Sequence, residues 1–346
     1  MAREYEPVES PDETTVFAYH DLTPPTTADV YRAHRTVSEY LPQTPLVRCE
    51  WLSAELDADV YLKREDTLPT GAFKVRGGVN LVSRLSEEFR ERGLIAASTG
   101  NHGQSVAYAG REFDVPVTIC LPEDANPGKV RAMERFGAEI TYHGDDYDEA
   151  RSHAERLATE EGYRYVHSAN ESELVAGVGT GGIEIVEELP DVDACLAPIG
   201  GGSCASGYCL TVGELTDADV VGVQSRAAPA AYRAWRDGHL DPHDTMETTA
   251  EGLATRVPFA LTQEILREKL DDFLLVEDDA INPAIKRLLE EEHVLMEGAC
   301  ATAVVALMDH HERFKDKTVV LPVSGRNLAV EKLGRIIGDS HATSPE

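Results

Sequence analysis

Two spacings of apolar residues alternate along most of the chain, one typical of amphipathic helices and the other of buried strands. The segments follow in the order helix 78–92, strand 94–97, helix 103–113, strand 115–121, helix 127–136, strand 138–143, helix 148–162 and strand 163–168. Glycine and proline residues mark short connections between them, which suits parallel strands joined through helices. The pattern therefore predicts an α/β fold with open, mostly parallel sheets flanked by helices.

The same alternation resumes in the second half of the chain. Strands are expected within 193–203, 220–225 and 317–325, and a long helical region near 280–310. Residues 87–162 are expected to form a small domain, and residues 36–86 together with 163–346 a large one. Residues 1–35 are polar and contain prolines, so we expect an arm that packs on the body or on a partner subunit.

The balance of charge is strongly acidic. Lys and Arg total 32 against 62 Asp and Glu, a formal net charge of −30 at pH 7, and only eight residues are lysine. This charge argues against a nucleic-acid or anionic-membrane partner, because phosphate groups would be repelled. We expect adaptation to a high-salt cytosol, where salt screens the repulsion between acidic side chains. An acidic enzyme of an ordinary cytosol is the alternative.

The lack of a membrane-spanning or leader segment and the positions of the cysteines both favour a reducing, cytoplasmic environment. No apolar run approaches the ~20 residues that span a bilayer, and the first residues lack the basic and apolar regions of a secretory leader. We therefore expect a cytoplasmic protein. The six cysteines form no CxxC pair, and several interrupt apolar runs, so buried free thiols are expected in place of disulfides or zinc ligands.

Lys74 is the first candidate for chemistry. It follows Phe73 in a glycine-bounded turn that opens a helix. In an apolar, partly desolvated position a lysine has a lowered pKa, so its free amine can attack a carbonyl compound and form a Schiff base. The alternative is an ordinary surface lysine at a helix start.

A polar loop with the sequence STGNHG, at residues 98–103, stands between a strand and a helix. Unpaired N–H groups and the helix dipole at such a position favour an anionic oxygen, for example of a carboxylate or a phenolate. The alternative is an ordinary capping turn.

A second loop contains Gly200, Gly201, Gly202 and Ser203 between a buried strand and a helix. Glycine lets the backbone approach a phosphate closely, and the N–H groups can bind the dianion without a basic side chain. A flexible strand-to-helix connection is the alternative.

Another glycine pattern, formed by Gly177, Gly179 and Gly182, matches GxGxxG. The preceding NESELV has no buried-strand pattern and no suitably placed acidic residue follows, so dinucleotide binding is not expected. We expect packing glycines at a helix start instead.

Ser324 lies at the carboxyl end of the last apolar strand, and Gly325 opens the turn after it. Ligands of open α/β sheets bind at these strand ends, so Ser324 is a candidate site residue. Taken alone, it is also typical of a helix N-cap.

The segments AFKVRGG, STGNHG, PIGGGS, EGLAT, LMEGACA and PVSGRN together occur in the order and spacing of pyridoxal-phosphate enzymes of fold type II, over about residues 40–337. The chain most resembles the threonine/serine dehydratases, because Val-Arg-Gly-Gly follows Lys74, where cysteine and threonine synthases usually have Lys-Asp-Arg. The resemblance implies a tryptophan synthase β-like fold, with pyridoxal 5′-phosphate in the cleft between two sheets.

The resemblance also implies a role for each residue of these motifs. Lys74 would hold the cofactor as a Schiff base and later take the proton from the substrate Cα. Phe73 would lie behind the pyridine ring, Asn101 would bond its O3′ oxygen, and Ser324 would face its nitrogen. The phosphate would be bound by Gly200, Gly201, Gly202 and Ser203, and the substrate carboxylate by Ser98, Thr99, Gly100 and His102.

These roles imply a dehydratase that converts L-threonine and L-serine to a 2-oxo acid and ammonia. Ser324 cannot hold a proton on the ring nitrogen as a carboxylate would, which favours elimination over transamination. Thr99 stands where racemising relatives have a catalytic serine, so a racemase, or a β-eliminating lyase acting on hydroxyaspartate, is the alternative. An amino-acid-binding module without catalysis is less expected.

Two further expectations concern metals and assembly. Gln224 stands where many relatives have an acidic residue for a structural cation, so no metal site is expected. The small-molecule substrate is an amino acid, and a homo-oligomer, either a dimer or a tetramer, is expected.

Overall fold

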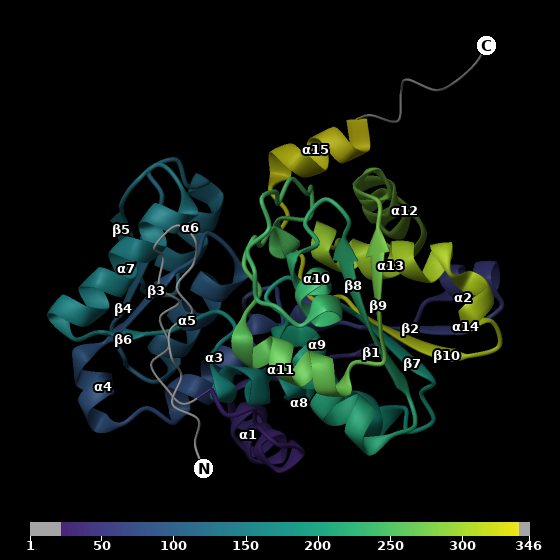
Figure 1. Ribbon diagram of the computed structural model, residues 1–346, viewed down its shortest axis with the longest axis horizontal. Helices are drawn as coiled ribbons and strands as arrows, with labels where there is room; N and C mark the ends of the chain where they lie inside the picture. The colour runs from purple at the N-terminus through teal and green to yellow at the C-terminus, as the bar shows by residue number, and fades with distance from the viewer. Residues whose placement is uncertain (1–21, 339–346) are drawn as a thin grey trace.

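The structure of the chain, a computed structural model, describes residues 22–338. Within this range the strands form two sheets that lie side by side and are surrounded by helices (Figure 1). The strand order is β1-β2-β10-β7-β8-β9 in the larger sheet and β5-β4-β3-β6 in the smaller one. Neighbouring strands are parallel except for the pair β1 and β2. The predicted α/β fold with two mostly parallel sheets is confirmed.

The elements have the following bounds. The larger sheet consists of β1 (Leu46–Arg48), β2 (Asp59–Lys63), β7 (Ala194–Pro198), β8 (Asp219–Ser225), β9 (Asp272–Val276) and β10 (Thr318–Pro322), and the smaller sheet of β3 (Leu94–Ala97), β4 (Val117–Leu121), β5 (Glu139–Tyr142) and β6 (Arg164–Tyr165). The α-helices are α1 (Thr27–Tyr40), α2 (Glu50–Leu56), α3 (Lys74–Ser83), α4 (Glu87–Arg92), α5 (Asn101–Glu112), α6 (Pro127–Glu134), α7 (Tyr147–Glu161), α8 (Ser172–Glu188), α9 (Ser203–Tyr208), α10 (Ala230–Asp237), α11 (Ala260–Lys269), α12 (Ile281–Glu292), α13 (Gly298–Asp309), α14 (His311–Phe314) and α15 (Val330–Gly338). Short helical turns are η1 (Glu65–Thr67), η2 (Cys209–Gly213), η3 (Glu251–Leu253) and η4 (Asp278–Ala280).

Helices cover both faces of the larger sheet. Successive residues of a strand point to opposite faces, and in β7 Ala194 and Leu196 belong to the apolar cluster that α12 and α13 also line. Cys195 and Ala197 belong to the other cluster, with α8, α9 and the buried side of α5. Because both faces are buried, these strands appear in the sequence as continuous apolar runs.

Three of the expected helices differ from the structure in their bounds. The helix expected over 78–92 is two helices, α3 and α4, because Ser86 caps a new helix by accepting a hydrogen bond from the Phe89 N–H. The helical region near 280–310 is also divided, since His293 has a φ of 55° and ends α12. The helix expected from residue 103 begins at Asn101, so two polar residues of the loop lie in its first turn.

The smaller sheet extends past the range 87–162 expected for a small domain, because β6 follows that range and pairs with β3. The division into domains stays a prediction. Residues 1–21 of the expected arm lie outside the described residues. The rest of the arm ends in α1, where Val30 and Ala33 are buried in the main core.

The GxGxxG glycines lie in the interior of α8 and not at its start. A Cβ at Gly177 would lie 2.5 Å from the Arg76 carbonyl oxygen, and one at Gly182 would lie 2.0 Å from Thr211 Oγ1. These glycines therefore allow α8 to pack closely against α3 and η2, which agrees with a packing role and not with dinucleotide binding.

The cysteine prediction is confirmed, since all six thiols are free and buried. The part of the chain from residue 22 to residue 338 contains no cluster of three or more metal-ligating side chains. No helix in that part combines the length and the apolar composition needed to cross a bilayer.

Candidate active site

Lys74 is the first residue of α3, and its amine is buried. The preceding turn is held to the end of β10, because the Phe73 N–H donates to the Ser324 carbonyl oxygen over 2.9 Å. Lys74 Nζ donates to the Ser168 carbonyl oxygen and to Ser203 Oγ, both at 2.8 Å. Burial lowers the pKa of Lys74 to about 8. The structure thus brings together two residues, Lys74 and Ser203, that are far apart in the sequence.

A buried network of ion pairs fixes the first turn of this helix. Arg76 donates to Glu65 on η1 and to Glu184 on α8, each over 2.7 Å. Glu184 also pairs with Lys63 on β2 over 2.7 Å. Because every charge in the network has a partner, the burial cost is offset, and α3 is held to β2 and α8.

The glycine loop after β7 provides a close-fitting backbone surface. A Cβ at Gly200 would lie 2.3 Å from the Gly252 carbonyl oxygen, and one at Gly202 would lie 2.9 Å from Thr262. Gly202 also has a φ of +89°, which a side chain would strain. The loop leads directly into α9 at Ser203. Its backbone N–H groups and the helix start fit a phosphate group.

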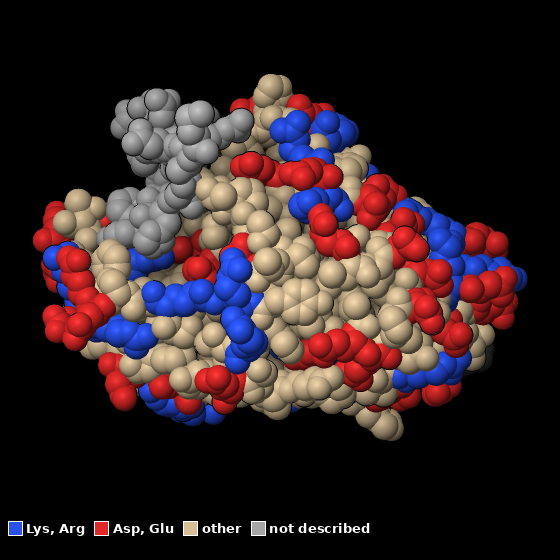
Figure 2. Space-filling model, turned by 90° about the horizontal axis from the view of Figure 1, so that it is seen from below, with Lys and Arg blue, Asp and Glu red and all other residues tan. Residues whose placement is uncertain are grey.

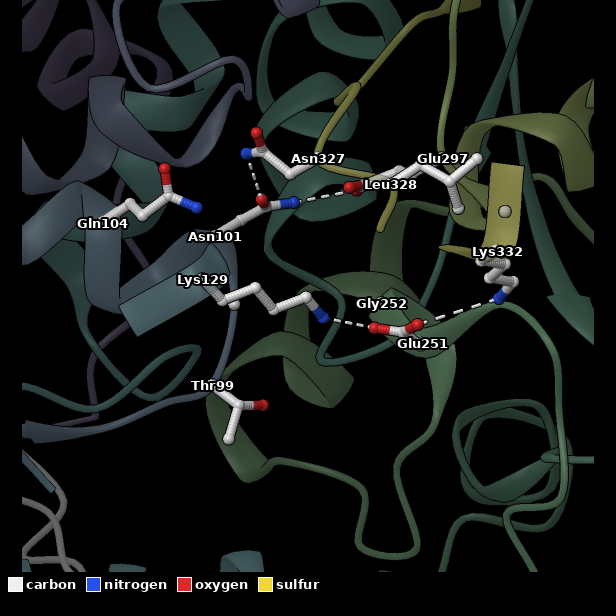
Figure 3. A pocket seen from close by; sticks show the side chains of 12 residues that line it. Thr99, Asn101, Gln104, Lys129, Glu251, Gly252, Glu297, Asn327, Leu328 and Lys332 are labelled. Carbon is white, nitrogen blue, oxygen red and sulfur yellow. Dashed lines mark hydrogen bonds and ion pairs between the residues drawn. The ribbon is translucent and has the colours of Figure 1, made fainter. Parts of the chain in front are cut away.

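Asn101 is the first residue of α5 and lies in the pocket between the two sheets (Figure 3). Its Nδ2 donates to Glu297 Oε1 over 2.8 Å, and its Oδ1 accepts from Asn327 Nδ2 over 2.7 Å. Asn327 Nδ2 also donates to the Thr70 carbonyl oxygen. These two hydrogen bonds orient the Asn101 amide, with its Nδ2 toward Glu297 and its Oδ1 toward Asn327.

Glu297 is a site residue that the sequence analysis missed. It is buried beside Asn101, and burial raises its pKa to about 7, against the lowering effect of the Asn101 hydrogen bond and of Lys129. The signal was a single carboxylate in the apolar segment LMEGACA, directly before α13.

The remaining residues of the STGNHG loop separate into two groups. Thr99 and Gly100 line the pocket with Asn101, and Ser98 Oγ accepts from the Gly100 N–H over 3.2 Å. His102 does not line this pocket. Its Nε2 lies 2.9 Å from the Val166 carbonyl oxygen, and burial lowers its pKa to about 3, so the ring is neutral and faces the interior.

Ser324 is buried at the end of β10, and its Oγ lies 3.1 Å from Cys300 Sγ on α13. Cys300 Sγ also donates to the Gly325 carbonyl oxygen over 3.2 Å. Burial raises the pKa of Cys300 to about 12, so the thiol stays protonated. The sequence analysis did not name Cys300, because only the fold brings it next to Ser324.

The pocket has a volume of about 90 Å³, and its walls come from loops and helices that pack on both sheets. Lys129 on α6 crosses it to form an ion pair with Glu251 on η3, and Lys332 on α15 approaches Glu251 from the other side (Figure 3). A second ion pair, between Arg256 Nη2 and Asp148 Oδ2 at 2.6 Å, also joins the two parts of the molecule.

Fold and site together combine two mostly parallel sheets with a buried lysine amine and a glycine loop that fits a phosphate group. Residues 37–325 match the model of the pyridoxal-phosphate dependent enzymes, and the chain belongs to this family. The L-threonine ammonia-lyase of Thermotoga maritima is 36% identical over 313 residues, which cover 90% of this chain and 78% of that protein.

Solved structures agree with this assignment. The processed form of threonine deaminase isoform 2 from Solanum lycopersicum superposes with a TM-score of 0.86 at 27% identity, and covers 99% of both chains. Serine racemase from Dictyostelium discoideum superposes with a TM-score of 0.82 at 29% identity, over 88% of this chain and 99% of the other. Both activities considered in the sequence analysis therefore occur on this fold.

Proposed function

We propose that this protein is an ammonia-lyase that uses pyridoxal phosphate to convert L-threonine and L-serine to a 2-oxo acid and ammonia. The observation that carries the proposal is the buried Lys74 amine, whose pKa of about 8 leaves it partly unprotonated near neutral pH. The relative from Thermotoga maritima supports threonine as a substrate. The glycine loop before Ser203 fits the phosphate of the cofactor, because the backbone there leaves no space for a Cβ.

The cofactor, when bound, supplies an electron sink next to the substrate Cα. Lys74 Nζ would take the proton from Cα, and the β-hydroxyl would leave as water when the bond between Cβ and oxygen breaks and the proton taken from Cα passes to the leaving oxygen. Ser98, Thr99 and Gly100, at the start of α5, would hold the substrate carboxylate. Water then hydrolyses the released enamine to the 2-oxo acid and ammonia.

Ser324 and Cys300 would determine how the reaction continues. Ser324 would face the ring nitrogen, and both its hydroxyl and the neighbouring Cys300 thiol are neutral. A neutral partner does not hold a proton on that nitrogen as a carboxylate would, so the electron sink is weaker and early loss of the β-hydroxyl is favoured.

Racemisation is the second candidate, and the fold match to a serine racemase supports it. Racemisation needs a second acid-base group on the side of the cofactor opposite the lysine. Thr99 has a hydroxyl at the position of the serine in racemising relatives, and it lines the pocket.

A substitution of Lys74 tests the proposal. We expect Lys74→Ala to abolish the visible absorbance of the bound cofactor and the release of 2-oxo acid from L-threonine and L-serine, with the fold unchanged by circular dichroism. Lys286→Ala, which removes an amine from α12, is the matched control and should behave as the wild type. Borohydride labelling at another lysine would contradict the assignment.

Three properties stay predictions. We propose a cytoplasmic homo-oligomer, a dimer or a tetramer, adapted to a cytosol of high salt. Light scattering in low and high salt would measure the assembly, and a monomer in both would refute that part.

A further inference from the structure

Two of the eight lysines of this acidic chain line the pocket in front of α5, and both point at one carboxylate. Lys129 Nζ donates to Glu251 Oε2. Lys332 Nζ lies 3.8 Å from Glu251 Oε1 and donates to the Thr249 carbonyl oxygen. Figure 3 shows the three side chains in a row across the pocket, with Glu251 in the middle.

Glu251 is charged at neutral pH. Burial alone would raise its pKa, but the hydrogen bond and charge of Lys129, together with the charge of Lys332, bring the pKa below its usual value. Glu251 therefore offsets the charge of Lys129, and part of the charge of Lys332, that an anionic ligand would otherwise meet at the pocket wall. An uncharged ligand does not disturb this ion pair, whereas an anionic one meets the Glu251 carboxylate.

The ion pair shares its pocket with the loop that is proposed to hold the substrate carboxylate. Thr99 and Asn101, at the start of α5, line the same pocket as Lys129 and Glu251. Gly252, next to Glu251, contacts the glycine loop at Gly200. A substrate with its carboxylate at the loop before α5 would therefore have the wall formed by Glu251 and Lys129 within the same pocket.

We propose that Glu251 is a specificity-determining residue, which restricts the enzyme to β-hydroxy amino acids without a second carboxylate. This inference rests on the proposed function. The methyl group of threonine and the hydrogen of serine leave the ion pair intact. A β-carboxylate, as in 3-hydroxyaspartate, would be repelled by Glu251. Lys129 could bind such a carboxylate, but its amine is already paired with Glu251.

The substitution Glu251→Gln tests this proposal, because it keeps the shape and removes the negative charge. We expect kcat/KM for L-threo-3-hydroxyaspartate, relative to that for L-threonine, to rise by at least about fivefold, a moderate factor because the pair is partly exposed to solvent. Adding Lys129→Met to this variant should remove the gain. Glu331→Gln, which removes the same charge from the exposed surface of α15, should leave the ratio unchanged.

A ratio that stays within about twofold of the wild-type ratio in Glu251→Gln, with L-threonine still converted, would overturn the proposal. A variant too slow for kinetics is tested by binding of L-aspartate and L-asparagine, which differ in charge but not in shape and have no β-hydroxyl to lose. Glu251→Gln should favour L-aspartate by about fivefold, and an equal change for both ligands would overturn the proposal. If the wild type converts no β-hydroxy amino acid, the proposed function fails, and the binding comparison still decides the role of Glu251.

Discussion

Burial of the Lys74 amine makes its reactivity depend on pH in a range where an ordinary lysine is fully protonated. Its pKa is about 8 instead of 10.5, so half of the amines are free near pH 8. We expect the rate at which the apoenzyme captures pyridoxal phosphate to rise between about pH 7 and 9 and then to level off. Borohydride trapping at a series of pH values measures this rate. A rate that still rises steeply at pH 10 would contradict the assigned environment.

The buried Glu297 carboxylate accepts a hydrogen bond from Asn101, but its negative charge should lower the free energy of unfolding. Its pKa is about 7 in the folded protein against 4.5 in an exposed carboxyl, so the folded state binds the proton more tightly than the unfolded chain. The free energy of unfolding therefore falls as the pH rises from about 4.5 to about 7. Above about pH 7 the contribution of Glu297 no longer changes with pH. We expect Glu297→Gln to lack this slope and to be more stable at pH 8 by about 1–3 kcal/mol.

The same substitution should lower activity, because a glutamine amide can present N–H groups to Asn101 Nδ2 in place of the acceptor oxygen. Urea unfolding at pH 5 and pH 8, with 2-oxo acid release from L-threonine, measures both effects. An unchanged pH slope would show that Glu297 is not the group responsible.

Thr99 should limit racemisation through the shape of its side chain. The extra methyl group restricts χ1, which turns the hydroxyl away from the substrate Cα in some rotamers. We therefore expect the variant Thr99→Ser to raise the ratio of D-serine to pyruvate formed from L-serine in D₂O. If the wild type already forms D-serine as fast as pyruvate, the dehydratase assignment fails.

At the scale of secondary-structure elements, helices α3 and α8 can pack closely only because residue 177 of α8 is a glycine. A Cβ at Gly177 would lie 2.5 Å from the Arg76 carbonyl oxygen and 2.8 Å from Gly77 Cα, and neither backbone atom can move without moving a helix. We expect Gly177→Ala to lower the free energy of unfolding by about 1–3 kcal/mol or more.

Gly334 on α15 is the matched control for this prediction, because no atom lies within 4 Å of a Cβ built there. In this helix alanine is favoured over glycine, so Gly334→Ala should be neutral or stabilising by up to about 1 kcal/mol. Equal effects of the two substitutions in urea unfolding would refute the packing role of Gly177.

Most strands of the fold could be predicted from the sequence, but some helix boundaries could not. β3, β4, β7, β8 and β10 appear within the expected ranges, because strands buried on both faces give unbroken apolar runs. β5 and β6 also lie within the expected ranges, although β5 is partly exposed. The division between α3 and α4 depends on one side chain, Ser86, and the pattern of apolar residues continues across it. β1, β2 and β9 were not predicted.

The candidate site was predictable where chemistry and backbone geometry coincide in a short segment. The local composition of the glycine loop and of the start of α5 predicts a ligand at each. In the structure the start of α5 lines the pocket, and the glycine loop lies against Gly252, another residue of the pocket wall. Lys129, Glu251, Glu297 and Cys300 were missed because each acts through a partner distant in the sequence. Only the tertiary structure creates these pairs.

Charge repulsion acts on the molecule as a whole. The formal net charge is −30, and Figure 2 shows Asp and Glu side chains spread over one face, with Lys and Arg beside many of them. In about 0.1 M salt the screening length is near ~10 Å, so acidic groups still repel one another. We expect the temperature of unfolding and the activity to rise steeply up to molar KCl. Full thermal stability in dilute buffer, with sucrose as the uncharged control, would refute the adaptation to salt.

Ser105 ties the smaller sheet to the reactive lysine, because its Oγ donates to the Lys74 carbonyl oxygen over 2.6 Å one turn after Asn101. A Cβ at Gly78 would lie 2.4 Å from the same Oγ, so α3 and α5 cannot slide past each other here. The hydrogen bond and this close approach hold the start of α3, with Lys74, against α5, the helix that begins at Asn101. The relative position of Lys74 and Asn101 is therefore set by direct contact between two helices and not by the loops around the pocket.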